Sequence, residues 1–247
     1  MTTRPQSPRA SPSRRRSSLP AENDVEAVLA WLEKQGTKKR RDEMARYAIP
    51  SANAFGVTVS ALRKYARELG KNHALAKALW ATGRYEARML AAMIDEPAKV
   101  TAAQMDRWCR DFDSWAICDM VCFALFDQTP HAFAKVEAWS RRRNEFERRG
   151  AFALLWSLAA HDRRTPDAVF AKALRVVEEA ADDDRNFVKK AVNMALRAVG
   201  RRSAGLNAAA VEVAERLAAS SDRTSRWIGK DALKELARPR AVRNTPK

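Results

Sequence analysis

The sequence of 247 residues lacks the features that define several large classes of protein. No run approaches the roughly 18 consecutive apolar residues of a membrane-spanning helix, so we expect no membrane association. No glycine-rich loop of the kinds that hold nucleotide phosphates is present. The three histidines (His73, His131 and His161) are scattered, and they predict neither a metal site nor a catalytic triad.

Cysteine, glycine and proline are also scarce. The three cysteines show no metal-ligand spacing, and two of them, Cys118 and Cys122, lie in a strongly apolar segment. We therefore interpret them as buried, reduced thiols of a protein in a reducing compartment, the cytoplasm. The chain has only 8 glycines and 10 prolines, and little of the alternation typical of strands. Alanine, leucine, arginine and glutamate dominate, so the composition favours helices.

Acidic residues are too few to balance the basic ones, and the formal net charge is +16. Residues 1–21 supply +5 and residues 238–247 supply +4, which leaves +7 for residues 22–237. The first segment has too few apolar residues to fold, so we expect a disordered basic tail, with an organellar transit peptide as the alternative. We expect a second basic tail at residues 238–247. The remaining charge suits a polyanionic partner, although a merely soluble basic protein is the alternative.

Helical patterns fill residues 22–237, which we interpret as a single all-α domain of about thirteen helices. The most apolar of these segments runs from Ser114 to Phe126 and predicts a core helix capped by Asp113 or Ser114. Trp115 and Asp119 stand four residues apart, on one face of this helix. The alternatives to a functional role are core packing for the indole and an ion pair with a neighbouring arginine for the carboxylate.

The C-terminal half contains an internal similarity. Residues 146–151 (FERRGA) match residues 187–192 (FVKKAV) after 41 positions, and a weaker match follows at 227–233. A period of about 40 residues with two helices per unit is typical of HEAT-like repeats, which stack into a curved solenoid with a concave face. Because the second helix of each pair begins with cations, we expect that face to be basic. An ordinary solvated helix start is the alternative.

Four segments, residues 73–95, 111–122, 144–155 and 186–202, together resemble the DNA alkylation repair enzymes, which are DNA glycosylases built from HEAT-like repeats. The resemblance covers about residues 24–237. It implies a superhelix that holds duplex DNA in its concave face and excises purines alkylated at N3 or N7, which carry a positive charge. It implies an open cleft rather than a deep pocket for a rotated base, and no metal or organic cofactor. We expect a monomer associated with the nucleoid.

The same resemblance assigns roles to particular residues. The catalytic group falls on Trp115, Asp119 and Arg149. The second tryptophan of the family falls on Met194, whose thioether offers an apolar surface but no indole face, so either the rate or the range of lesions is expected to differ. The predicted DNA-binding residues are Arg148, Lys189 and Lys190. Four further tryptophans are assigned to the core: Trp80, Trp108, Trp139 and Trp156.

These residues would share the chemistry as follows. Asp119 would stabilise the positive charge that develops on the deoxyribose as the glycosidic bond breaks, and would orient the attacking water. Trp115 would present its electron-rich face to the cationic base or sugar. Arg149 would hold a neighbouring phosphate. Two alternatives stay open: a non-catalytic DNA-binding member of the family, suggested by Met194, and a HEAT-type protein scaffold without a nucleic-acid partner.

Overall fold

The computed structural model describes residues 21–237; the two predicted tails lie outside this range, except that the first helix already begins at Ala21. The described chain is an all-α helical repeat, as predicted, and contains no strand. Three short 3-10 turns occupy Ala45–Tyr47, Pro97–Lys99 and Phe126–Gln128. The α-helices are α1 (Ala21–Gln35), α2 (Lys38–Met44), α3 (Val59–Leu69), α4 (His73–Ala81), α5 (Tyr85–Ile94), α6 (Ala102–Arg110), α7 (Trp115–Ala124), α8 (Ala132–Ser140), α9 (Glu145–His161), α10 (Asp167–Glu179), α11 (Asn186–Gly200), α12 (Ala204–Ala218) and α13 (Arg223–Leu236).

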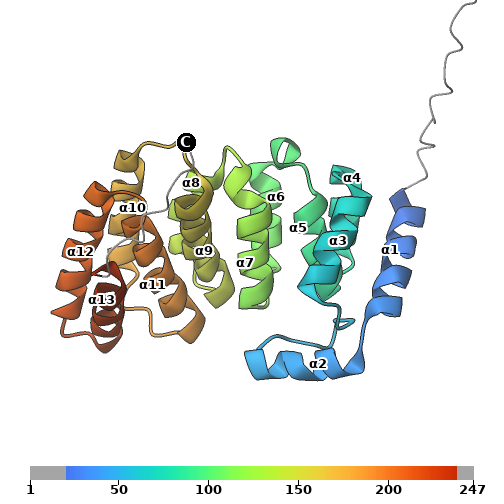
Figure 1. The fold of residues 1–247 in the computed structure, drawn as a ribbon, viewed down its shortest axis with the longest axis horizontal. Helices are drawn as coiled ribbons and strands as arrows, with labels where there is room; N and C mark the ends of the chain where they lie inside the picture. Colours follow the sequence, from blue (N-terminus) through green and yellow to red (C-terminus); the bar gives the residue numbers. More distant parts are fainter. Residues whose placement is uncertain (1–20, 238–247) are drawn as a thin grey trace, which may run out of the picture.

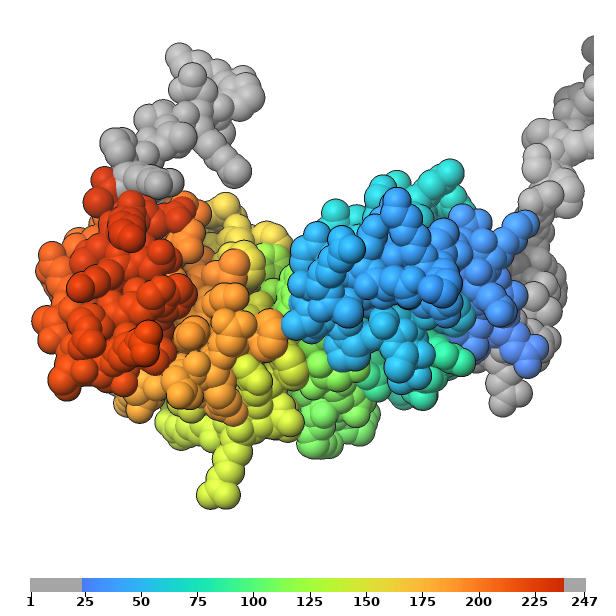
Figure 2. All heavy atoms as spheres, turned by 90° about the horizontal axis from the view of Figure 1, so that it is seen from below, coloured from blue at the N-terminus to red at the C-terminus, as the bar shows by residue number. Residues whose placement is uncertain are grey.

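The helices follow one another along the long axis of the molecule (Figure 1). Helix α1 lies at one end and the α12–α13 pair at the other, while α2 runs across the lower ends of its neighbours. Figure 2 shows this lower face, where the segment around α2 (blue) covers the N-terminal half and the last helices (orange and red) form the other half. No helix within residues 21–237 is both long and apolar enough to cross a bilayer.

Polar side chains fix where several helices begin. The Thr58 hydroxyl caps α3 by accepting from the N–H of Ala61, and the Ser114 hydroxyl caps α7 by accepting from the N–H of Ile117. Such caps satisfy N–H groups that have no partner within the helix. Of the two candidate caps for α7, the structure selects Ser114. Helix α7 ends at Ala124, earlier than the apolar run suggests, and a 3-10 turn continues the chain.

The stacked second helices of the repeats bring matching residues together, which explains the internal similarity of the sequence. Helix α9 packs on both α7 and α11, and α11 packs on α13. The rings of Phe146 and Phe187, 41 positions apart, have their centroids 5.4 Å apart. The Lys189 ammonium lies 5.8 Å from the ring centroid of Trp227 on the next repeat. The repeat period is thus the sequence spacing of residues that contact one another between layers.

The core confirms the burial expected of the thiols and of three tryptophans. Cys109, Cys118 and Cys122 are buried and form no disulfide. The indoles of Trp80, Trp108 and Trp139 are also buried. Trp80 and Trp108 stack with ring centroids 4.0 Å apart. Burial raises the pKa of the Cys109 thiol far above its usual range, so this group stays protonated and unreactive.

The loop between α2 and α3 is anchored to the body of the protein by a buried carboxylate. Helix α2 itself has no buried residue. The buried carboxylate of Glu86 on α5 accepts three main-chain hydrogen bonds, from the N–H groups of residues 55, 56 and 57, at 2.8, 2.6 and 3.1 Å. Gly56 adopts a φ of 85°, a left-handed conformation that glycine permits without strain. This anchor fixes the loop that leads from α2 to the pocket described next.

Candidate functional site

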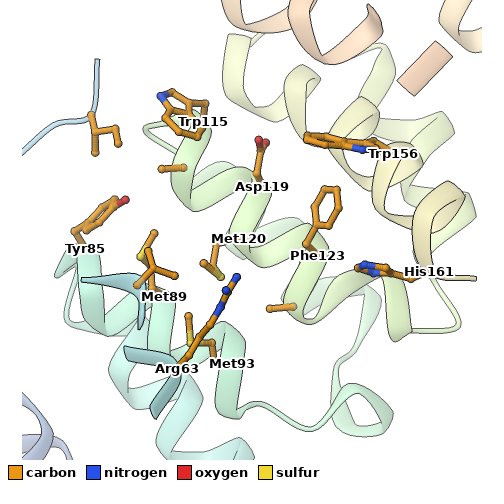
Figure 3. Close-up of a pocket in the computed structure, with 14 residues that line it drawn as sticks. Arg63, Tyr85, Met89, Met93, Trp115, Asp119, Met120, Phe123, Trp156 and His161 are labelled. Carbon is orange, nitrogen blue, oxygen red and sulfur yellow. The ribbon is translucent and has the colours of Figure 1, made fainter. Parts of the chain in front are cut away.

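A pocket of about 660 Å³ lies among α3, α5, α7 and α9 (Figure 3). Aromatic and methionine side chains dominate its wall, which also carries one carboxylate, one guanidinium and one imidazole: Asp119, Arg63 and His161. The other lining residues are Ile49, Val59, Tyr85, Met89, Met93, Trp115, Ala116, Met120, Phe123, Ala124 and Trp156. Mostly apolar pockets of this size with a few placed polar groups are typical of ligand sites.

Helix α7 supplies the centre of the pocket from one face. Trp115, Asp119 and Phe123 stand at spacings of four residues, so they line the same side of the helix, as predicted for the first two. The opposite side of α7 is buried in the core through Ile117, Cys118 and Val121, among others. The helix is therefore a core helix with one open face, which explains how a carboxylate is accommodated on so apolar a segment.

Asp119 is held by Arg149 in a bidentate pair. The Nε and Nη2 atoms of Arg149 donate to the two carboxylate oxygens at 2.9 and 2.7 Å, and its Nη1 donates to the Phe187 carbonyl oxygen at 2.8 Å. The Arg149 side chain is 5% exposed and the Asp119 side chain 18%. Because the remaining exposed part of Asp119 lies on the pocket wall, its carboxylate is still open to a ligand.

The electrostatics of this pair follow from its burial. Burial raises the pKa of the Asp119 carboxyl, and the charge and hydrogen bonds of Arg149 oppose but do not cancel this rise. For Arg149, burial lowers the pKa, but the nearby Asp119 carboxylate outweighs it and the pKa is raised. Arg149 thus orients Asp119 through an ion pair, the alternative role open to the carboxylate, and a contact of Arg149 with a phosphate stays a prediction.

Trp115 is half-buried at the mouth of the pocket. Its indole Nε1 donates to the carbonyl oxygen of Tyr47 at 2.8 Å, which ties α7 to the segment that follows α2. The ring lines the pocket, as does Ile49, which follows Tyr47 by two residues. The polar edge of the indole is therefore used in the fold, while the ring itself is available to a ligand.

The assignment of Trp156 to the core is wrong. Its side chain is only half-buried, and it lines the pocket with Trp115 and Asp119. The rings of Trp156 and Phe123 form an edge-to-face pair with centroids 4.6 Å apart. A signal was present in the sequence: Trp156 follows Arg149 by seven residues, about two helical turns, and so shares its face of α9. The pocket has two tryptophans, and the second comes from α9.

The other predicted site residues lie away from this pocket. Nη1 of Arg148 pairs with the buried carboxylate of Asp183 at 2.8 Å, and Lys190 is exposed on α11. Met194 is half-buried on α11 and is absent from the described residues that line the pocket. The aromatic residue of α11 whose main chain reaches Arg149 is Phe187, two turns earlier. Contacts of Arg148, Lys189, Lys190 and Met194 with DNA stay predictions.

Within residues 21–237, no group of three or more histidine, cysteine or acidic side chains could hold a metal ion. The fold is a solenoid of helix pairs, which defines the class as HEAT-like repeat proteins. One pocket of this solenoid carries a carboxylate and two indoles, and is a candidate site for a cationic or aromatic ligand.

Comparison with known proteins gives the family. A family model described as DNA alkylation repair enzyme matches residues 28–236, so the chain belongs to this family. A solved structure, described as belonging to "a new family of proteins related to the HEAT-like repeat DNA glycosylases with affinity for branched DNA structures", is similar to it. The TM-score is 0.71 at 22% identity, over 87% of this chain and 97% of that one, which establishes the shared fold. No curated protein matches the chain.

Proposed function

We propose that the chain is a DNA glycosylase that hydrolyses the N-glycosidic bond of purines alkylated at N3 or N7 in duplex DNA. The observation that carries the proposal is the Asp119 carboxylate, fixed by Arg149 and open to a pocket walled by the indoles of Trp115 and Trp156. The catalytic residues would be Asp119 and Trp115, with Arg149 as a positioning residue.

The geometry suits a reaction in which positive charge develops. As the bond between sugar and base breaks, the deoxyribose becomes cationic, and a fixed carboxylate stabilises that charge more than it stabilises the ground state. Each oxygen of Asp119 accepts only one hydrogen bond from Arg149, so lone pairs remain for water or for the sugar. The arginine reduces the field of the carboxylate but removes its freedom to turn away, so little reorganisation is needed during the reaction.

The two indoles suit the charge of the substrate. A purine alkylated at N3 or N7 is a cation, and indole faces attract cations by roughly 0.5–2 kcal/mol. A neutral purine lacks this term, so the aromatic wall would discriminate in favour of the damaged base. Trp156 would thereby provide the second indole that the family resemblance placed at Met194.

The DNA itself would be held by cations outside the pocket. We propose that Lys189 and Lys190 at the start of α11, together with Arg148, contact phosphates of the duplex, and that the protein acts as a monomer on the nucleoid. Lys190 is exposed, and the Lys189 ammonium lies over the exposed ring of Trp227. Arg148 would have to share its guanidinium with Asp183.

The direct test is release of 7-methylguanine from a duplex under single-turnover conditions. We expect release by the wild type and a loss of roughly 100-fold or more in Asp119→Asn, because the developing charge loses its counter-charge. Asp182→Asn, which changes an exposed aspartate that does not line the pocket, is the matched control and should leave the rate unchanged. No release by the wild type, or equal rates for wild type and Asp119→Asn, would remove Asp119 from the mechanism.

A second candidate is a DNA-binding protein without glycosylase activity, a role that the structural neighbour with affinity for branched DNA brings into consideration. Met194 and the engagement of Asp119 by Arg149 both favour it. In that case, salt-sensitive binding to a four-way junction would persist while base release stays at background. Met194→Trp should then raise release if the missing indole of α11 limits the rate. A HEAT-type scaffold would show neither binding nor release.

A further inference from the structure

The pocket carries one cation that the proposed hydrolysis does not use. Arg63 extends from α3 into the pocket, where Figure 3 shows its side chain passing Met93 with the guanidinium directed toward Met120. Within residues 21–237, no salt bridge joins Arg63 to an acidic side chain. The charge of Asp119 is already balanced by Arg149, and His161 pairs with Asp127 at 2.6 Å. The pocket therefore combines aromatic and thioether walls with one guanidinium available to an anion.

The pocket continues along α3 into a second hollow of about 380 Å³. The two share Arg63, Met93 and Ala124, and the second adds Arg67 and Lys71. Arg63 and Arg67 lie one turn apart on the exposed side of α3, and both are exposed. Lys71 is committed to the fold, because its ammonium donates to the carbonyl oxygens of Met93 and Asp95. Two arginines thus line an open path that leads out of the aromatic pocket.

We propose that the pocket and this path bind an unpaired nucleotide: the base packs against Trp156, Phe123 and the methionines, and the flanking phosphates contact Arg63 and Arg67. Aromatic faces bind unstacked bases, and guanidinium groups bind phosphates. A paired base cannot enter such a pocket, because its faces are covered by its neighbours in the stack. The substrate preferred in binding is therefore DNA with an unpaired residue rather than a regular duplex, unlike the open cleft that the family resemblance implies. The inference rests on the DNA-binding part of the proposed function and not on base excision.

The test uses the full chain and two DNA duplexes that differ only in one 2-aminopurine, which is either paired with thymine or left unpaired as a single-base bulge. Affinity and 2-aminopurine fluorescence are measured at fixed salt. We expect roughly tenfold tighter binding to the bulged DNA, with quenching of its fluorescence, because one base gains an aromatic contact. Equal affinity for the two duplexes would overturn the proposal.

Two exposed cations on neighbouring positions of α3 provide a matched pair of variants. Arg63→Gln should move the ratio of the two affinities toward one, since it removes the cation of the pocket. Lys64→Gln is one residue away and outside both hollows, so it should weaken binding to both duplexes alike and leave the ratio unchanged. An unchanged ratio in Arg63→Gln, or an equal fall of the ratio in both variants, would contradict the assignment.

The outcome is independent of the glycosylase test. If the protein releases 7-methylguanine but binds bulged and regular duplexes equally well, the glycosylase proposal stands and the unpaired-nucleotide proposal is wrong. A clear preference for bulged DNA without any base release would mean the reverse.

Discussion

Two runs of basic residues in this protein have similar sequences but differ in solvent exposure. Residues 38–41 on α2 (KKRR) are all exposed, and α2 has no buried residue. Arg148 and Arg149 on α9 turn inward, with side chains 23% and 5% exposed. The first run faces solvent, whereas the arginines of the second run form ion pairs with aspartates of neighbouring segments. A cation run in a sequence therefore does not by itself indicate a surface for phosphates.

The difference arises from what packs against each helix. Helix α9 lies between α7 and α11, and an aspartate meets each of its arginines: Asp119 on α7, and Asp183 just before α11. Burial without these carboxylates would be strongly unfavourable, so the pairs are a condition of the packing. On α2, Lys38 pairs only with the exposed Asp42 of the same helix, at 2.8 Å. Within residues 21–237, no acidic side chain forms an ion pair with the other three cations of that run.

The largest expected effect tests whether the α9 pair is structural. Arg149→Ala leaves Asp119 in a largely buried position without its counter-charge, and we expect a loss of about 3–5 kcal/mol in the free energy of unfolding. Arg148→Ala is the control, and should cost much less because Asp183 keeps its two bonds to Arg185. Urea denaturation measures both. Equal losses in the two variants would show that the burial of Arg149 is not what matters.

A smaller effect is expected on α2, in binding rather than in stability. Lys39→Gln with Arg40→Gln should weaken binding to duplex DNA roughly tenfold and flatten its salt dependence, because up to two phosphate contacts are lost. Stability should stay within about 0.5 kcal/mol, since neither side chain is buried. Lys77→Gln with Lys172→Gln, two exposed lysines on α4 and α10, is the control of equal charge. If that control weakens binding as much, α2 has no special part in holding DNA.

The smallest effect is a contrast in pH dependence between Asp119 and Asp183. Burial raises the pKa of Asp119 despite Arg149, so the folded state gains stability as the pH falls through this raised value toward the ordinary 3.8. For Asp183, burial acts to raise the pKa, but the bonds and charges of Arg185 and Arg148 outweigh it and the pKa is lowered. Its contribution is present above the ordinary value and is lost as the pH falls through the lowered one.

This contrast can be measured by unfolding the wild type, Asp119→Asn and Asp183→Asn in urea between about pH 3 and 7. Relative to Asp119→Asn, the wild type should become more stable as the pH falls, whereas relative to Asp183→Asn it should become less stable. Slopes of the same sign would mean that the two pairs on α9 are electrostatically equivalent.

Much of the fold was predictable because its signals are local. Caps such as Thr58 and Ser114 begin helices through bonds that reach only three residues along the chain. The match of Phe146 with Phe187 indicated the repeat, since stacked layers place equivalent residues in contact. The shared face of Trp115 and Asp119 followed from helical geometry alone.

The rest of the site depends on contacts between distant segments. The pairing of Asp119 with Arg149 joins residues 30 apart, and the bond from Trp115 to Tyr47 joins residues 68 apart. An apolar helix predicts a buried tryptophan at position 156, and only the packing of α7 against α9 shows that Trp156 faces the pocket.

The all-α chain of stacked helix pairs, and the side of α7 that carries Trp115 and Asp119, could be predicted from the residues alone, because they follow from hydrogen bonds and periodicities within a few turns of helix. Which cations are buried, and which indole lies with Trp115 on the pocket wall, depends on how distant helices pack together. A side chain's charge and size are fixed by its own residue, but its surroundings are fixed by helices that fold against it from elsewhere in the chain.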